Sequence, residues 1–183
     1  MRTIRRRRKE KKTNYTKRIK FLKSEKPRLV FRKTNQFVIG QYVLSSEAQD
    51  KVSFGVTSKK LLTLGWPEKF KGSLKSIPAS YLVGYYLGKK IQKDKLETPI
   101  VDFGMSRMIH KTKVFGFLKG IIDSGLEISC KEEAFPEEER IKGANLKEDF
   151  SSEFEKIKLN IEATSKKAGL KEGVPSKIEG VKA

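Results

Sequence analysis

The chain has 183 residues and a formal net charge of +19 at pH 7, with 41 Lys and Arg against 22 Asp and Glu. This length suits one domain with tails, and the excess of positive charge favours a nucleic acid or an anionic membrane surface as the partner. A single cysteine excludes an internal disulfide and a cysteine-based metal cage, and no run reaches the roughly 20 apolar residues of a membrane span. The N-terminus lacks the apolar segment of a secretory signal, so we expect a cytoplasmic protein with no membrane partner.

Positive charge is concentrated at the N-terminus. Residues 1–33 hold 16 Lys and Arg and two acids, whereas ten acids lie between Glu127 and Glu155. Residues 1–13 repel one another and have little to bury, so we expect an extended or disordered arm that needs a polyanion to lie against. The composition predicts three regions, which are a basic arm and helix at 1–26, an α/β core at 27–130, and an acidic segment with a helix and a flexible tail at 131–183.

Amphipathic spacing predicts a short helix after the arm, with Tyr15, Ile19 and Leu22 on one face and basic residues between them. This helix should end before Pro27, because the residue before a proline disfavours helical geometry. Segments rich in β-branched and aromatic residues follow, separated by polar turns. They predict an antiparallel meander of three strands, at 29–31, 37–44 and 52–57.

Several details of this meander affect which side chains face the core. Gly40 is a candidate bulge in the second strand. In the third strand Val52, Phe54 and Val56 alternate toward one side. Ser58 is placed to cap the short helix that follows.

A longer helix is predicted at about 79–94. Ser76 precedes Pro78 by the offset expected for a capped helix start. Gly84 and Gly88 within this helix would allow a close approach to the sheet. The helix therefore belongs to the predicted core.

The remaining pattern completes an α/β order. An apolar run at 99–104 suits a buried strand, and the 114–122 segment has the clearest helical periodicity of the chain. A strand that follows a helical crossover needs a parallel partner, so we expect a mixed sheet with packed helices. A last amphipathic helix is predicted over 150–161, with an apolar stripe so narrow that folding against a partner is one alternative.

The chemistry of the arm favours a nucleic acid. Lys and Arg neutralise phosphates, Arg also stacks on bases, and Tyr15 lies among them as in RNA-binding segments. A solubilising or targeting tail is the alternative, but the basic charge continues into the helix and the first strand. The arm residues that we expect to contact RNA are Arg2, Arg5, Arg6, Arg7, Arg8, Lys9, Lys11, Lys12, Tyr15, Lys17 and Arg18.

A second basic cluster precedes the 114–122 helix, and it consists of Arg107, His110, Lys111 and Lys113. Backbone donors at the start of a helix favour anions, so this loop is a candidate phosphate site. His110 is the only histidine, which excludes a two-histidine metal site. We expect it to be an RNA-contacting or solvent-exposed side chain.

Catalysis finds no support in the sequence. Asp102 lies in a predicted strand, where metal-dependent nucleases of the ribonuclease H type hold Mg²⁺, but such chemistry needs several convergent carboxylates. We expect Asp102 to pair with an arginine or a backbone donor instead. No phosphate-binding P-loop, Ser-His-Asp set or dinucleotide fingerprint is present. We therefore predict no enzyme activity and no cofactor.

Many short motifs follow one another over about residues 2–148. They are Arg5–Arg8, Thr13–Tyr15, Leu22–Val30, Arg32–Asn35, Gly65-Trp66, Pro78–Leu82, Asp102–Gly104, Val114-Phe115, Lys119-Gly120, Asp123–Ile128, Phe135-Pro136 and Arg140–Gly143. Taken in this order, they resemble the universal ribosomal protein L-eighteen family in its archaeal form, which is related to a eukaryotic ribosomal protein numbered L-five. Met108-Ile109 departs from the family pattern, since smaller residues or proline are usual there.

This resemblance implies a structural, non-enzymatic protein of the large ribosomal subunit with a ribonuclease-H-like fold. It implies binding to 5S rRNA in the central protuberance, contact with large-subunit rRNA, and as neighbours a separate ribosomal protein, L-five, and other large-subunit proteins. We expect no homo-oligomer. Carried over by position, it adds Arg28, Arg32, Lys33 and Asn35 to the RNA contacts. The alternatives are a Mg²⁺-dependent nuclease of the same fold and a basic protein that compacts nucleic acids in general.

Overall fold

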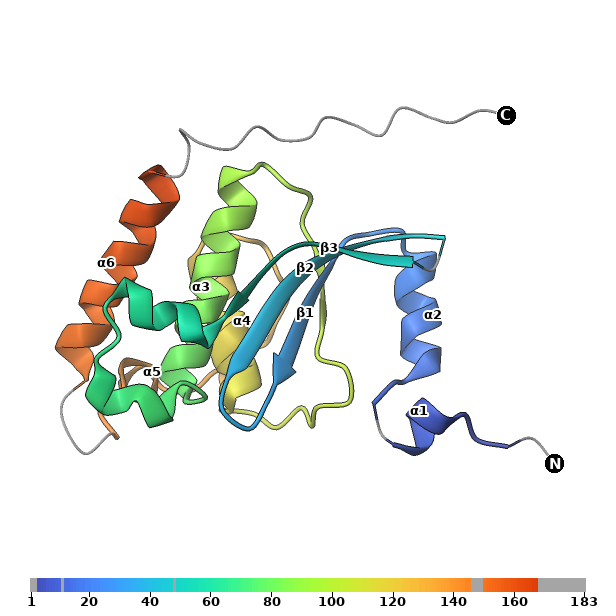
Figure 1. The fold of residues 1–183 in the computed structure, drawn as a ribbon, viewed down its shortest axis with the longest axis horizontal. Helices are drawn as coiled ribbons and strands as arrows, with labels where there is room; N and C mark the ends of the chain where they lie inside the picture. The colour runs from blue at the N-terminus through green and yellow to red at the C-terminus, as the bar shows by residue number, and fades with distance from the viewer. Residues whose placement is uncertain (1–2, 11, 48, 146–149, 168–183) are drawn as a thin grey trace.

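The computed structural model describes residues 3–10, 12–47, 49–145 and 150–167. Four strands form one open sheet in the order β3-β2-β1-β4, and Figure 1 labels β1, β2 and β3. The first three strands are antiparallel, whereas β4 lies parallel to β1, which confirms the predicted mixed sheet. The strands are β1 Arg28–Lys33, β2 Val38–Ser46, β3 Gln49–Thr57 and β4 Ile100–Asp102.

The helices lie on both sides of this sheet. α3 and α4 cover one face, α6 packs on the far side of α3, and α2 lies beyond the opposite face (Figure 1). None of the described helices is long and apolar enough to cross a membrane. The α-helices are α1 Arg6–Lys9, α2 Tyr15–Lys23, α3 Ile77–Lys93, α4 Lys113–Asp123, α5 Glu138–Lys142 and α6 Ser151–Lys167, and the 3-10 helices are η1 Ser58–Leu64, η2 Glu68–Ser73 and η3 Glu132–Ala134.

The packing of α3 on α4 depends on glycine. A Cβ at Gly84 would lie 2.2 Å from the carbonyl oxygen of Phe117, and a Cβ at Gly120 would lie 2.1 Å from that of Tyr81. Only a residue without a side chain lets the two backbones approach so closely. The predicted approach of Gly84 and Gly88 to the sheet is therefore wrong, because both residues face α4.

The predicted bulge at Gly40 is also wrong. The register of β2 with β3 shifts between Tyr42 and Val43. The extra residue on β3 changes the side to which neighbouring positions point, so Val52 is exposed while Val56 is buried. Gly40 instead lies under the helices, where a Cβ would clash with a leucine side chain of α3.

Two short helical segments differ from the prediction. Ser58 lies inside η1 and does not cap it; its hydroxyl accepts a hydrogen bond from the backbone N–H of Val38 at 3.1 Å. This buried N–H at the start of β2 needs a partner, which explains the different role. The arm contains the helical turn α1 where an extended chain was expected, because the Arg5 carbonyl accepts hydrogen bonds from the backbone N–H groups of Arg8 and Lys9.

The last helix packs against its own chain. The Phe150 ring lies 4.6 Å from that of Trp66, and the Phe154 ring lies 5.4 Å from that of Tyr81. α6 thus buries its narrow stripe against the body and needs no separate protein for this purpose. The stripe consists of Phe150, Phe154, Ile157 and Ile161, all buried.

Candidate nucleic-acid interface

The cations of α1, Arg6–Lys9, are exposed, and this helix has no buried residue. Arg6 forms an ion pair with Glu10 at 2.8 Å, and the guanidinium of Arg5 lies 4.9 Å from the centre of the Tyr15 ring. Exposed ion pairs contribute only about 0–1 kcal/mol, so phosphates can replace them at little cost. These contacts therefore leave the positive charge of the arm available to a polyanion.

Asp50 connects the arm to the body. Its carboxylate accepts hydrogen bonds from Arg18 of α2 at 2.8 Å, from Arg28 of β1 at 2.6 Å and from the Ser45 hydroxyl at 2.9 Å. Burial by itself raises the pKa of Asp50, but these three hydrogen bonds together outweigh it and hold the pKa below its ordinary value. The ionised carboxylate therefore fixes α2 to the sheet at neutral pH.

Asp102 serves as a structural carboxylate, as predicted. Its Oδ2 atom lies 2.9 Å from Arg32 and 3.9 Å from Arg28, and its Oδ1 atom accepts a hydrogen bond from the backbone N–H of Gly104 at 2.7 Å. Arg28 is only 4% exposed, so in this structure it links the two carboxylates of the sheet face. Its predicted contact with RNA stays a prediction.

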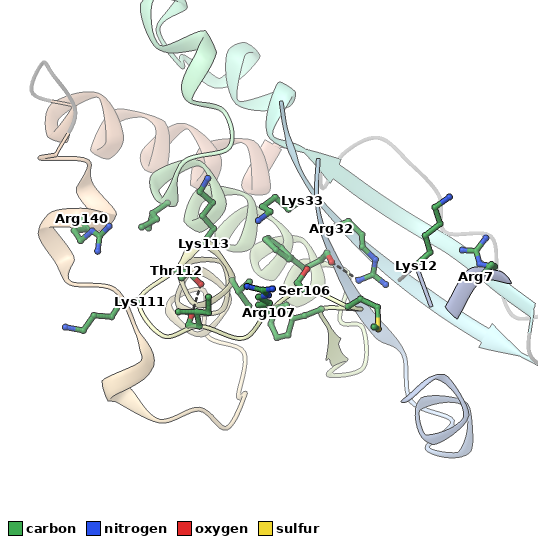
Figure 2. A pocket seen from close by; sticks show the side chains of 16 residues that line it. Arg7, Lys12, Arg32, Lys33, Ser106, Arg107, Lys111, Thr112, Lys113 and Arg140 are labelled. Atoms are coloured by element: carbon green, nitrogen blue, oxygen red, sulfur yellow. Dashed lines mark hydrogen bonds between the residues drawn. The ribbon is translucent and has the colours of Figure 1, made fainter. Parts of the chain in front are cut away.

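A cavity of about 840 Å³ lies between the arm and the body, and we call it the basic cavity. Half of its sixteen lining residues are Lys or Arg, and none is Asp or Glu. Such a one-signed surface attracts polyanions. Its cations come from the arm, β1, the 103–112 loop, α4 and α5 (Figure 2), and they are Arg7, Lys12, Arg32, Lys33, Arg107, Lys111, Lys113 and Arg140.

Lys113 shows how crowded these cations are. Burial, and then repulsion from Lys33 and Lys75, lowers the pKa of Lys113. The hydroxyl of Thr112 donates to the Ile109 carbonyl and does not cap α4, so the first N–H groups of this helix add to the positive potential at the cavity. A bound phosphate would relieve this repulsion.

The structure brings together only part of the predicted contact set. Those that line the basic cavity are Arg7, Lys12, Arg32, Lys33, Arg107, Lys111 and Lys113. Those exposed elsewhere are Arg5, Arg6, Arg8, Lys9, Lys17, Asn35 and His110. Tyr15 and Arg18 are half-buried, and the predicted contacts of Arg2 and Lys11 lie outside the described residues.

Arg140 is the cation of the basic cavity that the sequence reasoning missed. It follows Glu137–Glu139, and this acidic stretch hides it from any argument based on local charge. The buried side chain of Ile141 holds α5 against α3, which places Arg140 at the cavity. Its place in the family motif Arg140–Gly143 was the signal that could have found it.

The described residues offer no metal centre. Within 3–10, 12–47, 49–145 and 150–167, no three His, Cys, Asp or Glu side chains gather so that they could hold a metal ion. Asp102 is already paired with Arg32, whose guanidinium lies 2.9 Å from its Oδ2 atom.

Comparison with known proteins settles the family. Residues 1–101 match the family described as "Ribosomal large subunit proteins 60S L5, and 50S L18". The large ribosomal subunit protein uL18 of Korarchaeum cryptofilum (strain OPF8) is 37% identical over 141 residues, which cover 77% of this chain and 70% of that protein. The chain belongs to the L18 family. It is of the archaeal type, as the sequence motifs predicted.

Membership of the L18 family says in which particle this chain works. The chain is a structural, non-enzymatic protein of the large ribosomal subunit, and it works in the cytoplasmic ribosome among rRNA and other large-subunit proteins. The match at residues 1–101 includes the arm, the whole meander and all of α3.

Proposed function

We propose that this L18-family chain binds 5S rRNA and helps to attach it to large-subunit rRNA in the central protuberance. The observation that carries the proposal is that cations from the arm and the body line one cavity from which acids are excluded. A merely solubilising tail would not need such alignment with the body. Arm cations neutralise phosphates and supply affinity, whereas the rigid body supplies shape and spacing.

Finer features of the proposal concern neighbours and architecture. The ribosomal protein L-five, which shares 5S rRNA, is a proposed neighbour in the same particle. For the body we propose a ribonuclease-H-like fold, because an antiparallel meander followed by a parallel strand with helices is compatible with it. The proposed division remains an arm at 1–26, a core at 27–130 and a C-terminal region at 131–183.

A competition binding assay tests the central proposal. The full chain is titrated with labelled 5S rRNA at about 0.15 M salt, with unlabelled duplex DNA of similar length as the competitor. We expect at least about 100-fold tighter binding to 5S rRNA, because shape and unpaired bases add to the common phosphate attraction. Equal affinity for the two nucleic acids would instead support a general compacting protein.

The nuclease alternative has its own measurement. Incubation of the full chain with 5S rRNA and Mg²⁺ should leave the RNA intact on a denaturing gel. Cleavage that requires Mg²⁺ and disappears in Asp102→Asn would overturn the structural role. Co-sedimentation of the chain with large subunits, and its release together with 5S rRNA, would support the proposal further.

A further inference from the structure

Five of the eight cations that line the basic cavity have no ion-pair partner among the residues that the structure describes. Arg32 is engaged by Asp102, Lys111 by Glu137 and Lys12 by Glu10. The cations without such a partner are Arg7, Lys33, Arg107, Lys113 and Arg140, of which Arg7 donates a hydrogen bond to the Thr13 hydroxyl. The interior of the cavity therefore has positive charge available for phosphate oxygens.

The same cavity has an apolar lining. Phe103 packs edge-on against the buried Phe31, with ring centres 5.9 Å apart. Met105 and Ile109 are 44% and 56% exposed, although both line the cavity. Exposed apolar side chains amid cations suit a ligand that has both an apolar face and a negative charge. A phosphate backbone alone would leave this lining uncovered.

A single nucleotide has both properties, and the cavity of about 840 Å³ is large enough to accept one. In a duplex the bases are stacked inside, so only an unstacked nucleotide can present its face to the lining. We propose that the basic cavity binds one unstacked nucleotide of 5S rRNA, with its base against Phe103, Met105 and Ile109 and its phosphate near Lys33 and Lys113. This inference rests on the proposed function; 5S rRNA is chosen because the arm residues Arg7 and Lys12 form one side of the cavity.

A matched pair of variants tests the apolar lining. Met105 and Met108 lie on the same loop and are 44% and 47% exposed, but only Met105 lines the cavity. Met105→Ser should weaken binding of the full chain to 5S rRNA about fivefold or more, since it removes apolar area that the base would bury. Met108→Ser should stay within about twofold of the wild type. Neither change removes a charge, so the salt dependence of binding should be unchanged in both.

A photo-crosslinking amino acid provides the positional readout. Placed at Ile109 in the full chain, it should crosslink to one loop or bulge nucleotide of 5S rRNA, even when large-subunit rRNA is present. Equal affinities of Met105→Ser and Met108→Ser, or crosslinks spread along a paired strand or directed to large-subunit rRNA, would overturn the inference. The proposed function fails separately, if the wild type binds 5S rRNA no more tightly than duplex DNA.

Discussion

The arm and the body differ in what holds their geometry. α1 and α2 contain no buried residue, whereas α3 alone buries eleven. Side-chain packing fixes the body before any partner arrives, but the arm is held by a few polar contacts such as that of Arg18 with Asp50. Under the proposed function, the arm supplies affinity, while the body supplies the shape and position of the RNA site.

The largest expected effect is a loss of stability of the body, caused by a substitution that leaves the arm unchanged. Gly120→Ala would place a Cβ 2.1 Å from the Tyr81 carbonyl oxygen, which belongs to the backbone and cannot rotate away. We expect a loss of about 3 kcal/mol or more of unfolding free energy, measured by urea denaturation. Gly72→Ala is the matched control, since nothing lies within 4 Å of its Cβ. Equal stability of the two variants would show that α3 and α4 do not pack as described.

Deletion of residues 1–12 removes part of the arm and leaves the body unchanged. It removes eight Lys and Arg but no buried side chain of the described part, so 5S rRNA affinity at about 0.15 M salt should fall about 100-fold or more. The urea midpoint of the body should not move. Gel-shift titrations at several salt concentrations measure both the loss of affinity and the expected flatter salt dependence. Unchanged affinity would contradict the central role of the arm.

A smaller effect is expected where the two regions meet. Asp50→Asn weakens the hydrogen bonds to Arg18 and Arg28, so α2 should lose its fixed position, with about threefold to tenfold weaker 5S rRNA binding. The unfolding free energy should fall by about 1–2 kcal/mol, because buried Arg28 keeps a poorer partner. Glu25→Gln is the control, an exposed carboxylate beside the same helix.

The lowered pKa of Asp50 predicts the direction in which the stability of the fold changes with pH. Its pKa is lowered in the folded state, so the carboxylate stabilises the fold above its ordinary pKa, and this contribution is lost as pH falls through the folded value. The difference in stability between the wild type and Asp50→Asn should therefore shrink in acid. A difference that is constant between neutral and acidic pH would show that ionisation of Asp50 is not what links arm and body.

The smallest effect concerns Lys113, where stability and binding should move in opposite directions. Its lowered pKa means that the charged form is disfavoured in the folded state, so this cost is present at neutral pH and disappears as pH rises toward the ordinary lysine value. Lys113→Met should raise the unfolding free energy by about 0.5 kcal/mol or less. It should also weaken 5S rRNA binding about threefold, which gel shifts can measure. Lower stability of this variant would contradict the described crowding of cations.

Much of the fold could be predicted because its signals are local. Alternating and helical apolar spacing located the meander, the 114–122 helix and the stripe of α6, and Ser76 accepts the expected capping hydrogen bond from the backbone N–H of Ala79. The errors arose where a distant element decided the outcome. Gly84 meets α4 and not the sheet, and Ser58 serves the start of β2 and not its own helix.

At the candidate site, too, local features could be predicted and those set by distant residues could not. The basic arm and the Arg107–Lys113 cluster were visible as charge in the sequence, whereas Arg140 was concealed by neighbouring acids. The burial of Arg28 was equally hidden, because its partner Asp50 lies 22 residues away on another strand. Local charge predicts which residues are cationic but not which of them are already neutralised.

The sequence by itself determined that this chain carries a basic N-terminal arm and that its motifs place it in the L18 family. Charge density and motif order are properties of the linear chain, so no coordinates were needed for either. Only the tertiary structure decided that the arm, β1, the 103–112 loop, α4 and α5 surround one basic cavity with an apolar lining. The physical reason is that sheet pairing and helix packing join segments more than 100 residues apart, and their combined charge and shape exist only in the folded molecule.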